Sequence, residues 1–163
     1  MIDDPALYAR AQALLSAYEA AGLRIATAES CTGGLVAGLL TAVPGSSVVV
    51  DRGFVTYSNA AKTGMLGVPA DLIAAEGAVS EAVARAMAEG ALARSEAQAA
   101  VAITGVAGPG GGSARKPVGL VHLALAFQGE ATTHLERRYG DRGRDEIRRR
   151  AVEDALGLLE ARA

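Results

Sequence analysis

The sequence is poor in the residues that usually cross-link a protein or hold a metal. Its 163 residues include one cysteine, two histidines, two phenylalanines and no tryptophan. A single cysteine, Cys31, cannot form an intramolecular disulfide, and His122 and His134 are too few for a typical zinc cluster. We therefore expect a protein of the reducing cytoplasm that holds no metal and needs no cofactor.

Neither sign of charge dominates, and long apolar runs are missing. Lys and Arg number 16 against 18 Asp and Glu, a formal net charge of −2, which offers no long-range field for nucleic acid or an anionic membrane. No apolar run reaches the ~20 residues that span a bilayer. The first residues enter an amphipathic pattern with acidic residues at its start, unlike a secretory signal. We expect no nucleic acid and no membrane among the partners.

Aromatic residues make up only 4% of a chain that is 50% hydrophobic. The core must therefore be built from alanine and branched aliphatic side chains, which lets helices pack closely. The length fits one domain over residues 1–163. The alanine-rich helices favour a homo-oligomer with a buried dimer interface, although packing within one monomer explains them equally well.

Apolar periodicity and turn signals divide the chain into alternating elements. Helices are expected over 5–22, 33–43, 59–66, 69–77, 80–97 and 144–161, and strands over 23–30, 46–58, 97–104, 119–127 and 131–139. Val48 to Val50 read as a fully buried run. The last two strands follow each other as a hairpin. This order predicts an α/β fold, a three-layer α/β/α sandwich with a mixed, mostly parallel sheet.

The segment TAESCTGG at 27–34 lies where a predicted strand turns into a helix. Helix starts carry unpaired N–H groups and a partial positive charge, so this turn can bind a phosphate or stabilise an oxyanion. Gly33 and Gly34 allow a close approach of the backbone to a ligand. Ser30 is the candidate nucleophile. The plainer interpretation is that Ser30 or Thr32 only caps the helix.

A serine needs an activating base, and the candidate by residue type is Lys62, preceded by Tyr57. An unperturbed lysine is neutral in only about one molecule in 2,500 at pH 7. Burial that lowers its pKa would make it a base, and Tyr57 is placed to relay or orient the proton. Taken alone, such a lysine is more often a surface residue.

Two further segments can contact a ligand. TGVAGPGGG at 104–112 follows a predicted strand and exposes backbone N–H groups, so we predict that Thr104, Gly105 and Gly108 lie near Ser30. GDRGRDEIR at 140–148 offers arginines near a helix start, which suit a phosphate. Cys31 beside a helix start is either inert packing or a reactive thiolate.

These segments, together with GSS at 45–47, RGFVTYSN at 52–59, GAVSE at 77–81 and KPVG at 116–119, resemble the nicotinamide-nucleotide amidohydrolase family, also known as the C-terminal domain of CinA proteins. The resemblance implies hydrolysis of nicotinamide mononucleotide to nicotinate mononucleotide and ammonia, without a metal. It implies that Ser30 is the nucleophile and that Tyr57 and Lys62 activate it.

The resemblance also implies which residues bind substrate: Cys31, Thr32, Gly33, Gly34, Thr104, Gly105, Gly108 and an arginine. Either Arg142 or Arg144 matches the phosphate-binding place, and we prefer Arg144 because it keeps four residues to Arg148. Two rival hypotheses remain. One is a hydrolase that uses Cys31, and the other is a non-catalytic nucleotide-binding or competence-associated interaction module.

Overall fold

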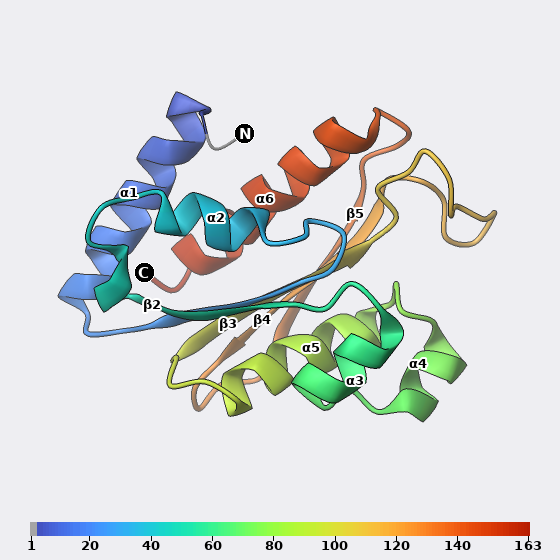
Figure 1. Cartoon of the computed structure of the whole chain (residues 1–163), viewed down its shortest axis with the longest axis horizontal. Coiled ribbons are helices and arrows are strands. Elements are labelled where there is room, and N and C mark those ends of the chain that lie inside the picture. Colours follow the sequence, from blue (N-terminus) through green and yellow to red (C-terminus); the bar gives the residue numbers. More distant parts are fainter. Residues whose placement is uncertain (1–2) are drawn as a thin grey trace.

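The computed structural model describes residues 3–163, and in this part of the chain five strands form one sheet with helices on both faces (Figure 1). The elements are, in order, α1 (Pro5–Ala20), β1 (Ile25–Glu29), α2 (Leu35–Thr41), the 3₁₀ helix η1 (Ser46–Val48), β2 (Val50–Val55), α3 (Asn59–Leu66), α4 (Ala70–Glu76), α5 (Glu81–Ala93), β3 (Ala99–Gly105), β4 (Leu120–Phe127), β5 (Thr133–Arg138) and α6 (Arg144–Glu160). Asp4 caps α1, accepting hydrogen bonds from the N–H groups of Ala6 and Leu7.

The strand order is β2-β1-β3-β4-β5. β1 pairs in parallel with β2 and β3, whereas β3 with β4 and β4 with β5 pair antiparallel. The predicted α/β/α sandwich with a mixed sheet and a terminal hairpin is confirmed, but parallel and antiparallel pairings are equal in the described part of the chain rather than mostly parallel. The three parallel strands end at the same edge of the sheet, which is where α/β folds bind ligands.

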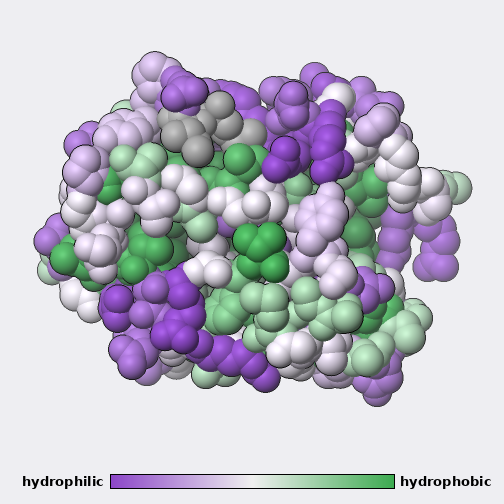
Figure 2. Space-filling model, viewed as in Figure 1, coloured by the Kyte–Doolittle hydropathy of each residue, from purple (hydrophilic) through white to green (hydrophobic). Residues whose placement is uncertain are grey.

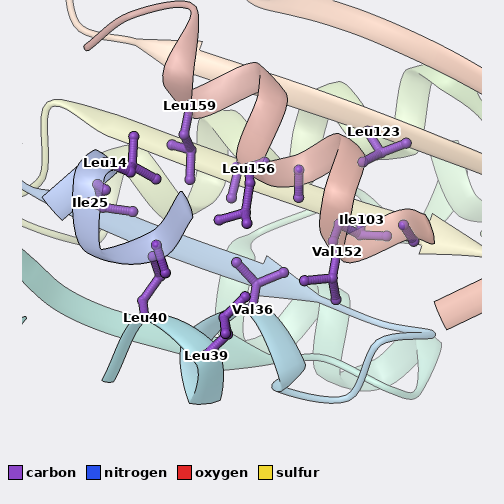
Figure 3. Close-up of a cluster of buried hydrophobic side chains, with 14 of the residues drawn as sticks. Leu14, Ile25, Val36, Leu39, Leu40, Ile103, Leu123, Val152, Leu156 and Leu159 are labelled. Carbon is purple, nitrogen blue, oxygen red and sulfur yellow. The ribbon is translucent and has the colours of Figure 1, made fainter. Parts of the chain in front are cut away.

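One face of the sheet is covered by α1, α2 and α6 over a core of branched aliphatic side chains. Figure 3 shows this cluster, in which Leu14, Val36 and Leu156 from three helices meet Ile25 and Ile103 from two strands. The strand residues alternate, so those next to Ile25 and Ile103 point to the other face. That alternation sends the larger side chains toward α1, α2 and α6.

The other face, under α3, α4 and α5, is built largely from alanine. Strand residues Ala26, Ala28, Ala100, Ala102, Ala124 and Ala126 meet Ala84, Met87, Ala88 and Ala91 of α5. Close packing reaches its limit at Gly90 of α5, where an added Cβ would lie 2.1 Å from the carbonyl oxygen of Leu66. The expected tight helix packing is therefore confirmed.

The segment before β2 differs from the prediction. Val48 is 56% exposed and ends η1, Val49 is buried and Val50 is only half-buried. The predicted fully buried run of Val48 to Val50 is wrong because β2 lies at the edge of the sheet and its start is preceded by a 3₁₀ turn, so one apolar residue of the run is turned outward. An apolar triplet alone does not distinguish an edge strand from a central one.

Figure 2 shows the face of Figure 1 as a surface, with hydrophilic residues gathered at its upper edge and lower left and weakly hydrophobic residues over α3 and α4. Among residues 3–163, no helix is long and apolar enough to cross a membrane. The exposed large hydrophobic residues in this range are Val48, Val55, Tyr57 and Met65.

Candidate active site

The candidate site lies where the carboxyl ends of the parallel strands meet. Ser30 directly follows β1, and its N–H donates to the carbonyl of Ile103 in β3 at 2.9 Å. On the other side, the N–H of Thr56 at the end of β2 donates to the carbonyl of Glu29 at 2.9 Å. The sheet thus fixes the backbone on both sides of the nucleophile candidate before any side chain contributes.

Lys62 is the residue that the structure brings to Ser30. It lies on α3, is 1% exposed, and its Nζ is 3.0 Å from Ser30 Oγ and 3.0 Å from the carbonyl oxygen of Thr56. The α3 helix begins after Ser58, whose side chain accepts a hydrogen bond from the N–H of Ala61. This cap sets the start of the helix, and the first turn then carries Lys62 inward.

Burial lowers the pKa of Lys62 below its ordinary value of 10.5 because the charged ammonium loses water. The one opposing influence is the Cys31 thiolate, yet burial raises the pKa of Cys31 to about 12, so the thiol stays protonated at neutral pH. No negative charge from Cys31 then favours the ammonium, and Lys62 is suited to act as a neutral base.

The same shift bears on Cys31 as a nucleophile. The thiolate is the reactive form of cysteine, and a pKa near 12 leaves almost none of it at neutral pH. The side chain is 6% exposed and packs in the core with Val36 and Ile147. The structure therefore favours the inert interpretation of Cys31.

Glu29 plays a part that the sequence did not reveal. Its two carboxylate oxygens accept hydrogen bonds from the N–H groups of Val36 and Ala37, at 2.9 and 3.0 Å, in the first turn of α2. The helix start is thus capped by Glu29 rather than by Ser30 or Thr32, as the plainer interpretation had it. Ser30 Oγ is left free to contact Lys62, and these two N–H groups are not available to a phosphate.

A cavity of about 300 Å³ opens beside Ser30. Its walls include Cys31, Lys62 and Tyr57 on one side and Thr104, Gly105 and Gly108 with Arg144 on the other. The turn residues Thr32, Gly33 and Gly34 do not line it. Thr104 donates its hydroxyl to the carbonyl of Ala78 at 2.8 Å, which holds the loop before α5 against the cavity.

Two predicted residues take up unexpected positions. Tyr57 is 62% exposed, and its hydroxyl accepts a hydrogen bond from Arg144 at 2.9 Å, with no bond to Ser30 or Lys62 within residues 3–163. Arg144 also donates to the carbonyl of Gly108 at 2.8 Å, so it bridges the mouth of the cavity. Arg142 does not line this cavity and donates instead to the carbonyl of Tyr139 at 2.9 Å.

The arrangement suits nucleophilic attack by a hydroxyl with a lysine as base. Within the described residues, no group of three or more His, Cys, Asp or Glu side chains is placed to hold a metal ion. The sequence signals that located Ser30, Lys62 and the glycine loop were motifs near the ends of strands. Glu29 had such a signal too, since it stands in the same TAESCTGG segment, but nothing in the pattern showed which N–H groups it would bind.

Comparison with known proteins gives one consistent result. The model of the CinA C-terminal domain matches residues 8–163. A CinA-like protein of Anaeromyxobacter dehalogenans is 58% identical over 140 residues, which cover 86% of this chain and 34% of that relative. A CinA-like protein of Akkermansia muciniphila is 55% identical over 141 residues, with the same two shares. The chain thus spans about a third of the length of these relatives.

Solved structures agree with the sequence comparison. The competence/damage inducible protein CihA of Agrobacterium tumefaciens superposes with a TM-score of 0.94 at 55% identity, covering 95% of this chain and 94% of that one. A competence damage-inducible protein A of Klebsiella pneumoniae gives 0.89 at 37% identity, covering 94% of each chain. The mixed sheet with helices on both faces is therefore shared with these proteins.

Proposed function

This chain belongs to the CinA C-terminal domain family, and from that premise we propose that it is a nicotinamide mononucleotide amidohydrolase with Ser30 as nucleophile. The observation that carries the proposal is the buried contact of 3.0 Å between Lys62 Nζ and Ser30 Oγ. A protein that only binds a nucleotide has no use for a hydroxyl held against a desolvated amine.

The proposed reaction begins with proton transfer. When Lys62 is neutral, the hydroxyl of Ser30 donates to its lone pair, while an N–H of the amine still donates to the Thr56 carbonyl. Lys62 takes the Ser30 proton as Oγ bonds to the carboxamide carbon, and the carbonyl oxygen becomes an oxyanion. Backbone N–H groups of the turn after Ser30 stabilise that oxyanion, each typically by ~3 kcal/mol of barrier.

The leaving group then needs the proton that Lys62 holds. Protonated Lys62 gives it to the amide nitrogen, the C–N bond breaks and ammonia leaves an ester on Ser30. A water molecule attacks this ester, passing one proton to Lys62, and Ser30 Oγ leaves and regains that proton. The products are nicotinate mononucleotide and free enzyme, and the lysine returns to its neutral form.

The 5′-phosphate is assigned to Arg144. It shares the cavity with Ser30 and already donates to two neutral oxygens, the Tyr57 hydroxyl and the Gly108 carbonyl. A phosphate is a stronger acceptor than either of them for a guanidinium. Arg142 lies outside the cavity, which favours Arg144 over the alternative that the sequence left open.

The proposal is tested by incubating the purified chain with nicotinamide mononucleotide. We expect stoichiometric ammonia and nicotinate mononucleotide, measured by a coupled ammonia assay and by chromatography. A raised melting temperature with nicotinamide mononucleotide but no ammonia would instead support the non-catalytic binding module. A homo-oligomer, a single domain over 1–163 and a cytoplasmic location stay predictions.

A further inference from the structure

Arg148 grips the turn that follows Ser30 from a helix at the far end of the sequence. It lies on α6, half-buried, four residues after Arg144. Its Nε donates to the carbonyl of Cys31 and its Nη2 to the carbonyl of Thr32, each at 3.1 Å. A planar guanidinium offers two donors in a fixed fork, so two successive peptide groups are held by one side chain.

This grip fixes the direction of the neighbouring N–H groups. In a trans peptide the N–H points opposite to the C=O of the same peptide unit. The N–H groups of Thr32 and Gly33 therefore point away from Arg148. The N–H of Gly33 closes the turn by donating to the Ser30 carbonyl at 3.0 Å, whereas the N–H groups of Cys31 and Thr32 have no acceptor within residues 3–163.

The turn needs such an outside support. Gly33 and Gly34 have positive φ values of 60° and 98°, and glycines restrain a backbone least. Donors lower a barrier when they are already aimed at the site of developing charge and need no reorganisation. The cation on the carbonyl side also polarises both peptide groups, which strengthens their N–H donors.

We propose that Arg148 is a positioning residue that orients the N–H groups of Cys31 and Thr32 as the oxyanion donors for Ser30. The inference rests on the proposed serine amidohydrolase function. Arg148 does not touch the substrate. It acts through two peptide groups, so its loss changes the reaction rate more than substrate binding.

Arg149 provides a matched control on the same helix. It forms ion pairs with Asp4 at 2.8 Å and Glu153 at 2.9 Å and makes no contact with the turn after Ser30. We expect Arg148→Met to lower kcat on nicotinamide mononucleotide by roughly 100-fold, the scale of losing an oxyanion donor, with KM nearly unchanged. Arg149→Met keeps both constants near those of wild type, and guanidinium added to Arg148→Ala restores part of kcat.

A second measurement does not depend on the identity of the substrate. A fluorophosphonate probe forms an O–P bond with Ser30 and releases fluoride, and its phosphoryl oxygen lies where the oxyanion would. We expect the labelling rate, followed by intact mass, to fall in Arg148→Met and not in Arg149→Met. If Arg148→Met does not fold, Arg148→Lys carries the same test, because one ammonium cannot reproduce the fork.

The outcomes separate the two proposals. Unchanged kcat and unchanged labelling in a folded Arg148 variant would overturn the positioning inference, as would equal losses in the Arg149 control. A wild type that is labelled, but does not hydrolyse nicotinamide mononucleotide, overturns the proposed substrate and leaves the labelling comparison to decide on Arg148. A wild type that shows neither activity nor labelling overturns both.

Discussion

The amine of Lys62 lies 3.0 Å from the hydroxyl oxygen of Ser30, although 32 positions separate them in the chain. The contact is buried, since Lys62 is 1% and Ser30 8% exposed. It exists because β1 and β2 are parallel neighbours, so that the residue after one strand and the helix after the other meet at the same edge of the sheet. A proton can pass between the two groups without any rearrangement.

The first prediction concerns pH. Lys62 must be neutral to accept the Ser30 proton, and burial lowers its pKa below 10.5, so kcat/KM rises as pH increases through that lowered pKa and then levels off. In Lys62→Arg the rise disappears along with most activity, because a guanidinium does not deprotonate in this range. A pH–rate profile of wild type that is flat or falls over the same range contradicts this account.

Tyr57 provides a second test, because its hydroxyl contacts Arg144 rather than Ser30 or Lys62. We expect Tyr57→Phe to keep kcat within about tenfold, below the 10²–10⁴ typical of a general acid–base group. Steady-state kinetics of the purified variant measure it. A loss of 10³-fold or more would show that Tyr57 moves to the dyad during turnover and relays the proton, as the family resemblance implies.

Arg144 and Arg142 can be told apart by a substrate that lacks the phosphate. Charge-assisted hydrogen bonds are worth about 1.5–3 kcal/mol, so Arg144→Ala should raise KM for nicotinamide mononucleotide by about 10- to 100-fold. Its effect on nicotinamide riboside should be much smaller. Arg142→Ala serves as the control with little effect on either substrate, and the reverse pattern would assign the phosphate to Arg142.

Cys31 should be dispensable for the chemistry. Its thiol is protonated at neutral pH because its pKa is about 12. Cys31→Ala therefore retains most of kcat, with some loss of stability from the missing sulfur in the core. Iodoacetamide should not inactivate the wild type at neutral pH, and inactivation in step with modification of Cys31 would instead support the cysteine hydrolase.

Glu29 should matter for stability through α2. Replacing Glu29 by Gln substitutes an amide NH₂ for one acceptor, so one of the N–H groups of Val36 and Ala37 loses its partner. We expect the free energy of unfolding to fall by about 1–3 kcal/mol, measured by urea denaturation. The exposed Glu19 is the matched control, where Glu19→Gln should change stability by less than ~0.5 kcal/mol.

Local patterns in the sequence were sufficient for most of the fold. The Asp4 cap, the Ser80 cap of α5 and the hairpin of β4 and β5 each depend on residues near one another in the chain, and each is present in the structure. Val48 was misplaced because an apolar run does not reveal that its strand lies at the sheet edge. The proximity of Ser30 and Lys62 followed from the family resemblance, not from any local pattern.

Contacts between distant segments are where sequence reasoning stopped. Arg148 reaches residues 116 and 117 positions away, and among several arginines of one basic segment nothing marked it as the one that binds the turn. Likewise the Arg144 bridge to Tyr57 spans 87 positions. Such pairs depend on how α6 packs across the sheet, which the periodicity of α6 alone does not determine.

The most direct test of the central claim is ammonia release from nicotinamide mononucleotide by wild type, Ser30→Ala and Lys62→Met under identical conditions. We expect turnover by wild type and a loss of at least about 10²-fold in each variant, with the double variant little worse than either, since the two residues act as one unit. Normal turnover by folded Ser30→Ala would contradict the claim.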